Sequence, residues 1–408
     1  MQPSANGGGG LIRWWFAAAV VGMGALAAGW LSYEFWRLLF QPGIMGAVDL
    51  LLRRDEVHRW FGGLPVYSEL RTATYPPASM VLLWPLVGWL DATASRWLWA
   101  ISTIGALAWL VWLVVHASGA RTRFEIAFVA LLPLASYAAG AAIGNGQLIV
   151  QVLPILLAAV LLLRSNELRG WKWRILAAGL LLASLVKPTL ATPFFWIALF
   201  AAGSPWPVVF ASAGYVGLTL LAAQFQPTPL PILLREWLAR SQITATGSSG
   251  ANLHAWLAAL GLGDWIPAAS LLVLLFLGAW VYRHRHADLW LLLGVTSIVT
   301  NMWSYHLWYD DLIVVLAGIS VFRLARSVAP TRPLMLTRAL LAALVLTSLA
   351  PGGLYTLPPP WNGVYVWLQT VVRVAVLVYL IGETRRQSAL SVAHPLPAPR
   401  ASTAQTIV

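Results

Sequence analysis

The sequence "WWFAAAVVGMGALAAGWLSY" occupies residues 14–33 and contains no charged side chain. It is about as long as the roughly 20 apolar residues that a helix needs to cross about 30 Å of hydrocarbon. Similar runs recur along the 408-residue chain, which is 59% hydrophobic and 10% charged, whereas a soluble domain has about 25% charged residues. Helices satisfy their own backbone hydrogen bonds in lipid, and we find no strand-like alternation. The sequence therefore predicts an all-α polytopic membrane protein.

The first apolar run also has one feature of a signal peptide. It contains Ala25-Leu26-Ala27, which has the form of a signal-peptidase site, and a single basic residue, Arg13, precedes it. Because the run is as long as a full span, we expect an uncleaved first helix.

The composition excludes several kinds of chemistry. The chain has no cysteine, which rules out disulfides and thiolate chemistry. Its seven histidines and six methionines show no metal-ligand spacing, so we expect neither a metal nor a cofactor. The formal net charge of +12 would suggest nucleic acid as the partner of a soluble protein. Here Arg and Lys cluster in short loops between apolar runs, which is typical of cytoplasmic loops. We therefore expect a lipid bilayer, and no nucleic acid, as a partner.

These basic loops orient the apolar runs. With the basic loops inside, residues 34–75 and 224–265 form long outer loops and both termini lie in the cytoplasm. Because residues 34–75 lie outside and Arg121 lies inside, the chain crosses the membrane an odd number of times between them. Of the two apolar runs there, we expect the proline-rich run 75–90 to enter the membrane and return on the same side. We predict about twelve full spans plus this short re-entrant or interfacial helix, all in one domain over residues 1–386. The Pro/Ala/Ser-rich tail, residues 387–408, is predicted to be disordered.

The polar clusters that anchoring does not explain all fall on the outer face. "GNGQ" (144–147) ends a single span that begins after Arg123, and "VKP" (186–188) ends another. "WSYHLWYDD" (303–311) leads into a span over residues 307–322. This coincidence predicts a site at the outer membrane face.

The first outer loop carries the most charge. A helix through residues 46–60 would be amphipathic and would lie in the membrane interface, with most of its charges solvated. Asp49 differs from these charges because apolar residues flank it in "GAVDLLL". A carboxylate at the membrane edge needs a partner or a function, and Asp49 is therefore a candidate for chemistry.

The segment 303–311 is rich in aromatic residues, which an interfacial belt explains. A belt does not explain Asp310 and Asp311, because each carboxylate costs about 2.5–3.5 kcal/mol at a span centre and less near its end. His306 and Asp310 are one helical turn apart, and we expect them to lie on the same face of a helix.

Two further clusters remain open between structural and functional interpretations. Gly144 and Gly146 fit a tight turn, in which Asn145 and Gln147 act as caps. Lys187 is the lone lysine on the outer side, and it precedes Pro188. It either extends to the lipid headgroups or provides a fixed cation for a phosphate.

Taken in order, these motifs resemble a known family. The order "VDL", "GGLPVY" and "YPP" in the first outer loop, followed by "GNGQ", "KP" and "YHLWYDD", is similar to glycosyltransferase family 87 over about residues 11–382. The resemblance implies the C-type glycosyltransferase fold, with its active site at the outer face of the bacterial plasma membrane. It implies a polyprenyl-phosphate sugar donor, commonly carrying mannose, a lipid or glycan acceptor, and inversion at the anomeric carbon.

The resemblance also implies roles for residues. Asp49 would act on the acceptor hydroxyl, and His306 would assist it. Because the leaving phosphate needs positive charge, we considered Lys187 and the arginines of the first outer loop, Arg53, Arg54, Arg59 and Arg71. The residues expected to bind substrate are Lys187, Asn145, Gln147, Tyr75, Arg53, Arg54 and Asp310.

The alternative is a transporter or flippase, or a polymerase of a lipid-linked saccharide. Transporters bury ionisable groups near the middle of the membrane and show repeated halves. This sequence has its ionisable clusters at one face, which favours the transferase.

Overall fold

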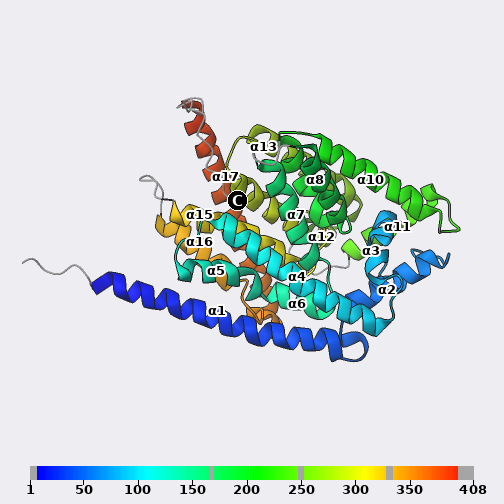
Figure 1. Ribbon diagram of the computed structural model, residues 1–408, viewed down its shortest axis with the longest axis horizontal. Coiled ribbons are helices and arrows are strands. Elements are labelled where there is room, and N and C mark those ends of the chain that lie inside the picture. The colour runs from blue at the N-terminus through cyan, green and yellow to red at the C-terminus, as the bar shows by residue number, and fades with distance from the viewer. Residues whose placement is uncertain (1–6, 166–169, 202, 247–251, 328–333, 394–408) are drawn as a thin grey trace, which may run out of the picture.

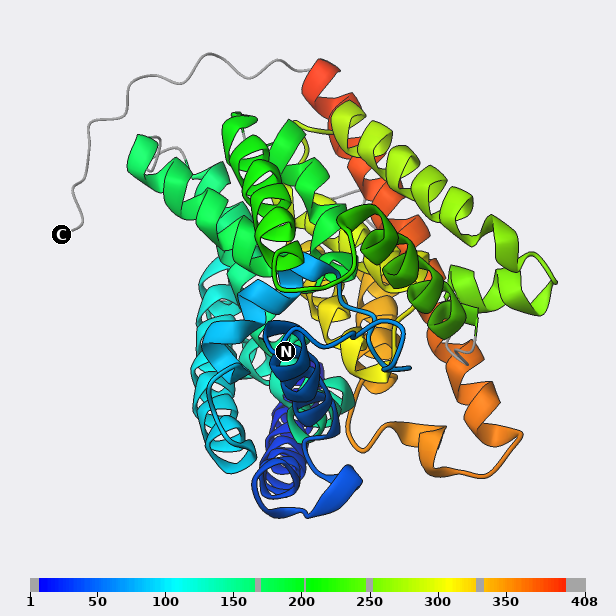
Figure 2. The same ribbon diagram turned by 90° about the vertical axis from the view of Figure 1, so that its right-hand side faces the viewer.

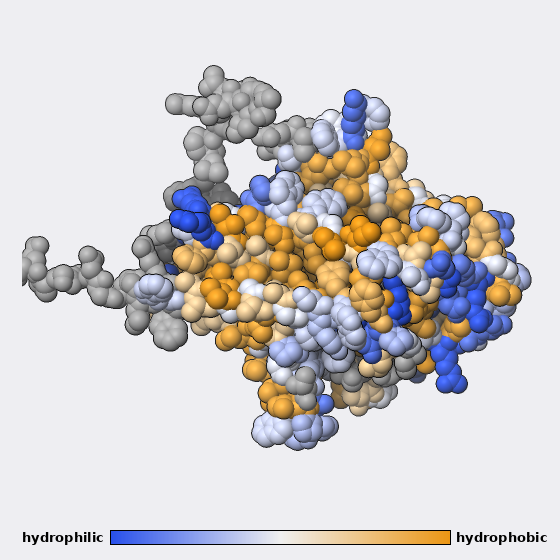
Figure 3. Space-filling view, turned by 60° about the horizontal axis from the view of Figure 1, so that its bottom comes forward, coloured by the Kyte–Doolittle hydropathy of each residue, from blue (hydrophilic) through white to orange (hydrophobic). Residues whose placement is uncertain are grey.

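The computed structural model describes residues 7–165, 170–201, 203–246, 252–327 and 334–393, and within them every regular element is a helix (Figure 1). On the face shown in Figure 3, apolar side chains cover much of the surface, and hydrophilic side chains gather at the end where Figure 1 places α2. This distribution is typical of a membrane protein.

Within the described ranges, five stretches of helix are long and apolar enough to cross a membrane. They are Phe16–Phe40 within α1 (Gly7–Phe40), α4 (Ala92–Ser118), α10 (Trp206–Ala223), Gly263–Arg283, which includes α13 (Ile266–Arg283), and Trp361–Ser388 within α17 (Trp361–Ala393). A sixth arises if α6 (Tyr137–Asn145) and α7 (Ile149–Arg164), bent by 117°, count as one span. The helical membrane fold is confirmed, but the count of about twelve spans is not.

Shorter helices complete the bundle. They are α2 (Val48–Phe61), α3 (Pro77–Val87), α5 (Arg123–Leu134), α8 (Trp171–Ser184), α9 (Pro188–Phe200), α11 (Leu230–Thr246), α12 (Leu253–Ala259), α14 (Leu289–Trp303), the 3₁₀ helix η3 (Trp308–Val314), α15 (Val315–Arg326) and α16 (Leu334–Leu346). Helix α2 confirms the helix predicted through residues 46–60.

The single span predicted between Arg123 and "GNGQ" is wrong. Helix α5 ends at Leu134, and α6 begins after Ser136, whose hydroxyl accepts a hydrogen bond from the backbone N–H of Ala139. The freed backbone groups pair with another segment, because Tyr137 N–H donates to the carbonyl of Ser348 at 3.0 Å. An N-cap together with outside partners stabilises a break that the apolar pattern does not reveal.

Two further boundaries differ from the sequence-based expectations. The outer loop predicted over residues 224–265 contains α11 and α12. Helix α17 continues to Ala393, so residues 387–393 are helical rather than disordered, and residues 394–408 lie outside the described residues.

Helix α11 packs against the loop that joins α2 to α3, as the end-on view shows (Figure 2). The indole N–H of Trp237 donates to the carbonyl of Thr74 at 2.9 Å. The guanidinium of Arg240 donates to the carbonyl of Tyr67 at 3.0 Å. These bonds satisfy loop carbonyls and hold α11 over the loop.

A buried polar network joins η3 to three helices, α6, α14 and α17. The carboxylate of Asp311 pairs with Arg373 of α17 at 2.6 Å and accepts from the Asn301 amide of α14 at 2.8 Å. It also accepts a hydrogen bond from the hydroxyl of Tyr137 in α6. Arg373 in turn donates to the Asn301 amide oxygen at 2.7 Å. Each charge has a partner, which a buried charge requires.

We expect Arg373→Met to destabilise the protein by about 3–5 kcal/mol, because it leaves the Asp311 carboxylate buried without its cation. The free energy of unfolding in detergent measures the effect. Arg59→Met is the matched control, since the Arg59 side chain is 34% exposed and its ion pairs are worth about 0–1 kcal/mol at most. Equal, small losses in the two variants would show that the network does not stabilise the bundle.

Candidate active site

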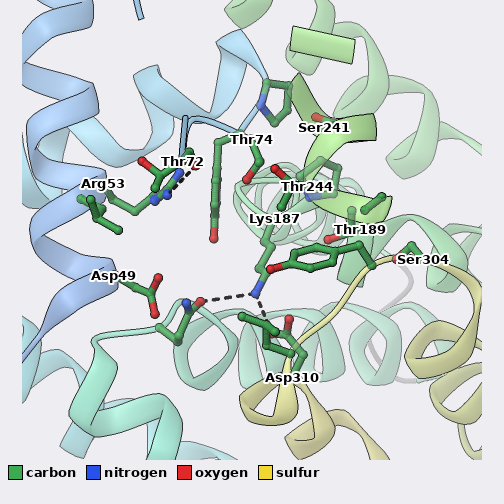
Figure 4. Close-up of a pocket in the computed structure, with 18 of the residues that line it drawn as sticks. Asp49, Arg53, Thr72, Thr74, Lys187, Thr189, Ser241, Thr244, Ser304 and Asp310 are labelled. Carbon is green, nitrogen blue, oxygen red and sulfur yellow. Dashed lines mark hydrogen bonds and ion pairs between the residues drawn. The ribbon is translucent and has the colours of Figure 1, made fainter. Parts of the chain in front are cut away.

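One pocket gathers most of the predicted site residues. Its volume is about 330 Å³, within the range of about 300–1,000 Å³ that is usual for small-molecule sites. Side chains from α2, the α2–α3 loop, the turn before α7, the start of α9, α11, α12, the segment before η3 and the first turn of η3 line it (Figure 4). The predicted residues among them are Asp49, Arg53, Tyr75, Gln147, Lys187 and Asp310.

The "GNGQ" turn positions the first turn of α2. Ala47 adopts a left-handed conformation (φ 54°) just before α2, and its N–H donates to the carbonyl of Gly144 at 2.9 Å. Gly146 also has a positive φ of 71°, and a Cβ there would lie 2.5 Å from the Cβ of Leu50. Only glycine fits this close, left-handed contact. The turn therefore brings Gln147 close to Asp49.

Asp49 is a carboxylate without an ion pair among the described residues. Its side chain has a hydrogen bond with Gln147. Burial raises the pKa of Asp49 above its ordinary value, and this hydrogen bond, together with the charges of Arg53 and Lys187, opposes the rise. A carboxylate that carries no fixed cation keeps its capacity to accept a proton.

Lys187 lies at the break between α8 and α9 and extends into the same pocket (Figure 4). Its ammonium is 2.6 Å from the Asp310 carboxylate and 3.4 Å from the amide oxygen of Gln147. It also lies 5.2 Å from the centre of the Tyr309 ring. Burial alone would lower the pKa of Lys187, but Asp310 raises it above the ordinary value, so the ammonium stays charged.

Arg53 forms the α2 side of the pocket. Its guanidinium is 2.5 Å from the Glu56 carboxylate, donates to the carbonyl of Thr72 at 3.0 Å, and stacks 4.5 Å from the centre of the Tyr75 ring. These contacts fix Arg53 and Tyr75 relative to each other at the pocket wall.

Three predicted residues do not line this pocket. Arg54 donates to the carbonyl of Leu90 at 2.8 Å. Asn145 is half-buried on the turn, outside the lining. His306 is buried behind the lining, 3.6 Å from Asp311.

The predicted pairing of His306 with Asp310 on one α-helical face is wrong. His306 precedes η3 and is not helical, so the spacing of an α-helix does not apply to it. It lies on the Asp311 side of the segment, whereas Asp310 faces Lys187.

The wall formed by α11 and α12 was not predicted from the sequence. Trp237, Ser241 and Thr244 line the pocket from α11, and His254 lines it from α12. Burial lowers the pKa of His254 to about 4. Its Nδ1 accepts from the N–H of Tyr305 at 3.0 Å, and its Nε2 is 2.7 Å from the Ser270 hydroxyl, so the neutral ring holds this loop.

The described residues contain no group of three or more His, Asp or Glu side chains that could hold a metal ion. The side chains that line the pocket supply carboxylates, cations, hydroxyls and an indole. This set can bind a polar ligand, accept a proton and stabilise negative charge.

Comparison with known proteins assigns the family. The model of glycosyltransferase family 87 matches residues 73–305, more than half of the chain. The match includes Tyr75, Lys187 and the α11–α12 wall, whereas Asp49 and Asp310 lie outside it. No curated protein and no solved structure matches the chain. The chain belongs to glycosyltransferase family 87 and is a glycosyltransferase.

Proposed function

We propose that this enzyme moves a hexose, with mannose the first candidate, from a polyprenyl phosphate to a lipid or glycan acceptor. The reaction takes place at the outer face of the bacterial plasma membrane, in a multi-pass C-type fold of about twelve spans. One observation carries this proposal: the carboxylate of Asp49, which forms no ion pair in the described part of the chain, lines the same pocket as the Lys187 ammonium. Proton acceptance and phosphate departure both require such groups within reach of one sugar.

The reaction would be a single displacement with inversion. The acceptor oxygen forms a bond to the anomeric carbon while Asp49 takes its proton. The bond from that carbon to the phosphate oxygen breaks, and its electron pair leaves with the polyprenyl phosphate. A base on one side and positive charge on the other lower the barrier to this step.

Gln147 couples the two sides of the proposed site. Its amide oxygen accepts from Lys187 at 3.4 Å, so its amide nitrogen is the group that can donate to Asp49. Lys187 and Asp310 would contact the donor as a pair. His306, next to Asp311, would assist by holding the segment that carries Asp310.

The direct test is release of the leaving group. The purified protein in lipid, incubated with polyprenyl-phosphate mannose and an acceptor extract, is expected to release free polyprenyl phosphate. A flippase or transporter would move the donor intact and release none. Absence of release with every polyprenyl-phosphate hexose would contradict the proposed donor.

Asp49→Asn keeps the shape of the side chain and removes the proton acceptor. We expect turnover to fall by about 10²–10⁴-fold while donor binding is nearly retained. Asp55→Asn is the matched control on the same helix, because the Asp55 side chain is 54% exposed and pairs with Arg59. Near-normal turnover of Asp49→Asn would show that the base is elsewhere.

The pH dependence follows from the same group. Because the pKa of Asp49 is raised and the base must be ionised, kcat/KM is expected to rise with pH through a value above that of an ordinary Asp. Gln147→Leu removes a hydrogen bond that lowers this pKa, so the acid limb should move to higher pH. Asn145→Leu is the control, because Asn145 lies on the same turn but outside the pocket. In this variant the acid limb should keep its position. If the acid limb of the kcat/KM profile did not move in Gln147→Leu, the pH dependence would not report the ionisation of Asp49.

A further inference from the structure

The positive charge inside the pocket is largely neutralised by neighbouring carboxylates. Lys187 pairs with Asp310 at 2.6 Å, and Arg53 pairs with Glu56 at 2.5 Å. Asp49 adds a further negative charge to the lining. A phosphate bound against these groups alone would meet little net attraction.

Two other arginines of α2, Arg54 and Arg59, contact partners outside the pocket. Arg59 pairs with Asp55 at 3.2 Å and with Glu69 at 3.0 Å. Arg54 donates to a backbone carbonyl at 2.8 Å. Neither residue lines the pocket.

Arg71 differs from the four basic residues described above. It lines the pocket from the α2–α3 loop, and its side chain is exposed, which places it where the pocket opens to its surroundings. The structure shows no ion pair or hydrogen bond of the Arg71 side chain among the described residues. Its guanidinium therefore keeps its full charge and five N–H donors for a ligand.

The reaction creates a need for such a cation. A polyprenyl-phosphate sugar is a phosphodiester with one negative charge, and breaking the bond to the sugar leaves a monoester that carries up to two. An unpaired guanidinium attracts the doubly charged monoester more strongly than the singly charged diester, which stabilises the departure of the phosphate. We propose that Arg71 supplies the unneutralised charge that binds the donor phosphate beside the Lys187–Asp310 pair, a role that rests on the proposed donor class.

The test measures phosphate recognition with and without turnover. Farnesyl phosphate and farnesol are the probes for binding, measured by thermal stabilisation of the purified protein, and polyprenyl-phosphate mannose is the donor for kinetics. Arg71→Gln is expected to raise the donor KM by about tenfold, as for the loss of a charge-assisted hydrogen bond, and also to lower kcat, because the interaction strengthens as the bond to the sugar breaks. The acceptor KM should be unchanged. It should also abolish the preference for farnesyl phosphate over farnesol.

Arg71→Lys, which keeps the charge, should fall between the wild type and Arg71→Gln. Arg59→Gln is the control, because Arg59 lies in α2 and pairs with Asp55 and Glu69 outside the pocket. This variant should match the wild type. An unchanged donor KM and an unchanged phosphate preference in Arg71→Gln would overturn the role of Arg71. A different result would separate the two proposals. If the wild type releases no polyprenyl phosphate, and Arg71→Gln nevertheless abolishes the preference for farnesyl phosphate, the proposed donor class is wrong but Arg71 still binds an anion.

Discussion

Two consecutive carboxylates in η3 each hold a cation from a distant part of the chain. Asp310 binds Lys187 and Asp311 binds Arg373, each at 2.6 Å. A 3₁₀ helix has three residues per turn, so neighbouring side chains point about 120° apart. The two aspartates can therefore face different sides: Asp310 faces the pocket, and Asp311 faces the helix bundle.

This division connects the bundle to the pocket. Asp311 with Arg373, Asn301 and Tyr137 fixes η3 against α14, α17 and α6. Once η3 is fixed, Asp310 has a defined position from which to hold Lys187. Because removing one member of a buried ion pair costs far more than an exposed pair contributes, both pairs restrict the arrangements that the surrounding helices can adopt.

The sequence was informative where the signal was local. Asp49 interrupts an apolar run in a predicted helix, and that helix is present. The break between α8 and α9 that carries Lys187 was visible in Pro188. The pairing of Lys187 with Asp310 was not, because 123 residues separate them and no local periodicity relates them. His306 was assigned to the face of Asp310 because an α-helix was assumed where the chain is first extended and then 3₁₀.

The wall formed by α11 and α12 was missed for a different reason. Residues 224–265 read as a loop because they are bounded by turns and are less apolar than the spans. A local signal was present, since "LPILLREWLAR" begins with a proline near a helix start and then spaces its apolar residues as in a helix. Whether that helix covers a pocket depends on contacts such as Trp237 with Thr74, which the sequence does not contain.

The central claim is that donor and base meet in this pocket. A cryo-EM structure with a non-transferable donor, in which a methylene group replaces the oxygen between the sugar and the phosphorus, tests it most directly. We expect the anomeric carbon to face Asp49 and the phosphorus group to lie against Arg71 at the opening. A donor bound elsewhere on the protein, with Asp49 facing an empty pocket, would contradict it.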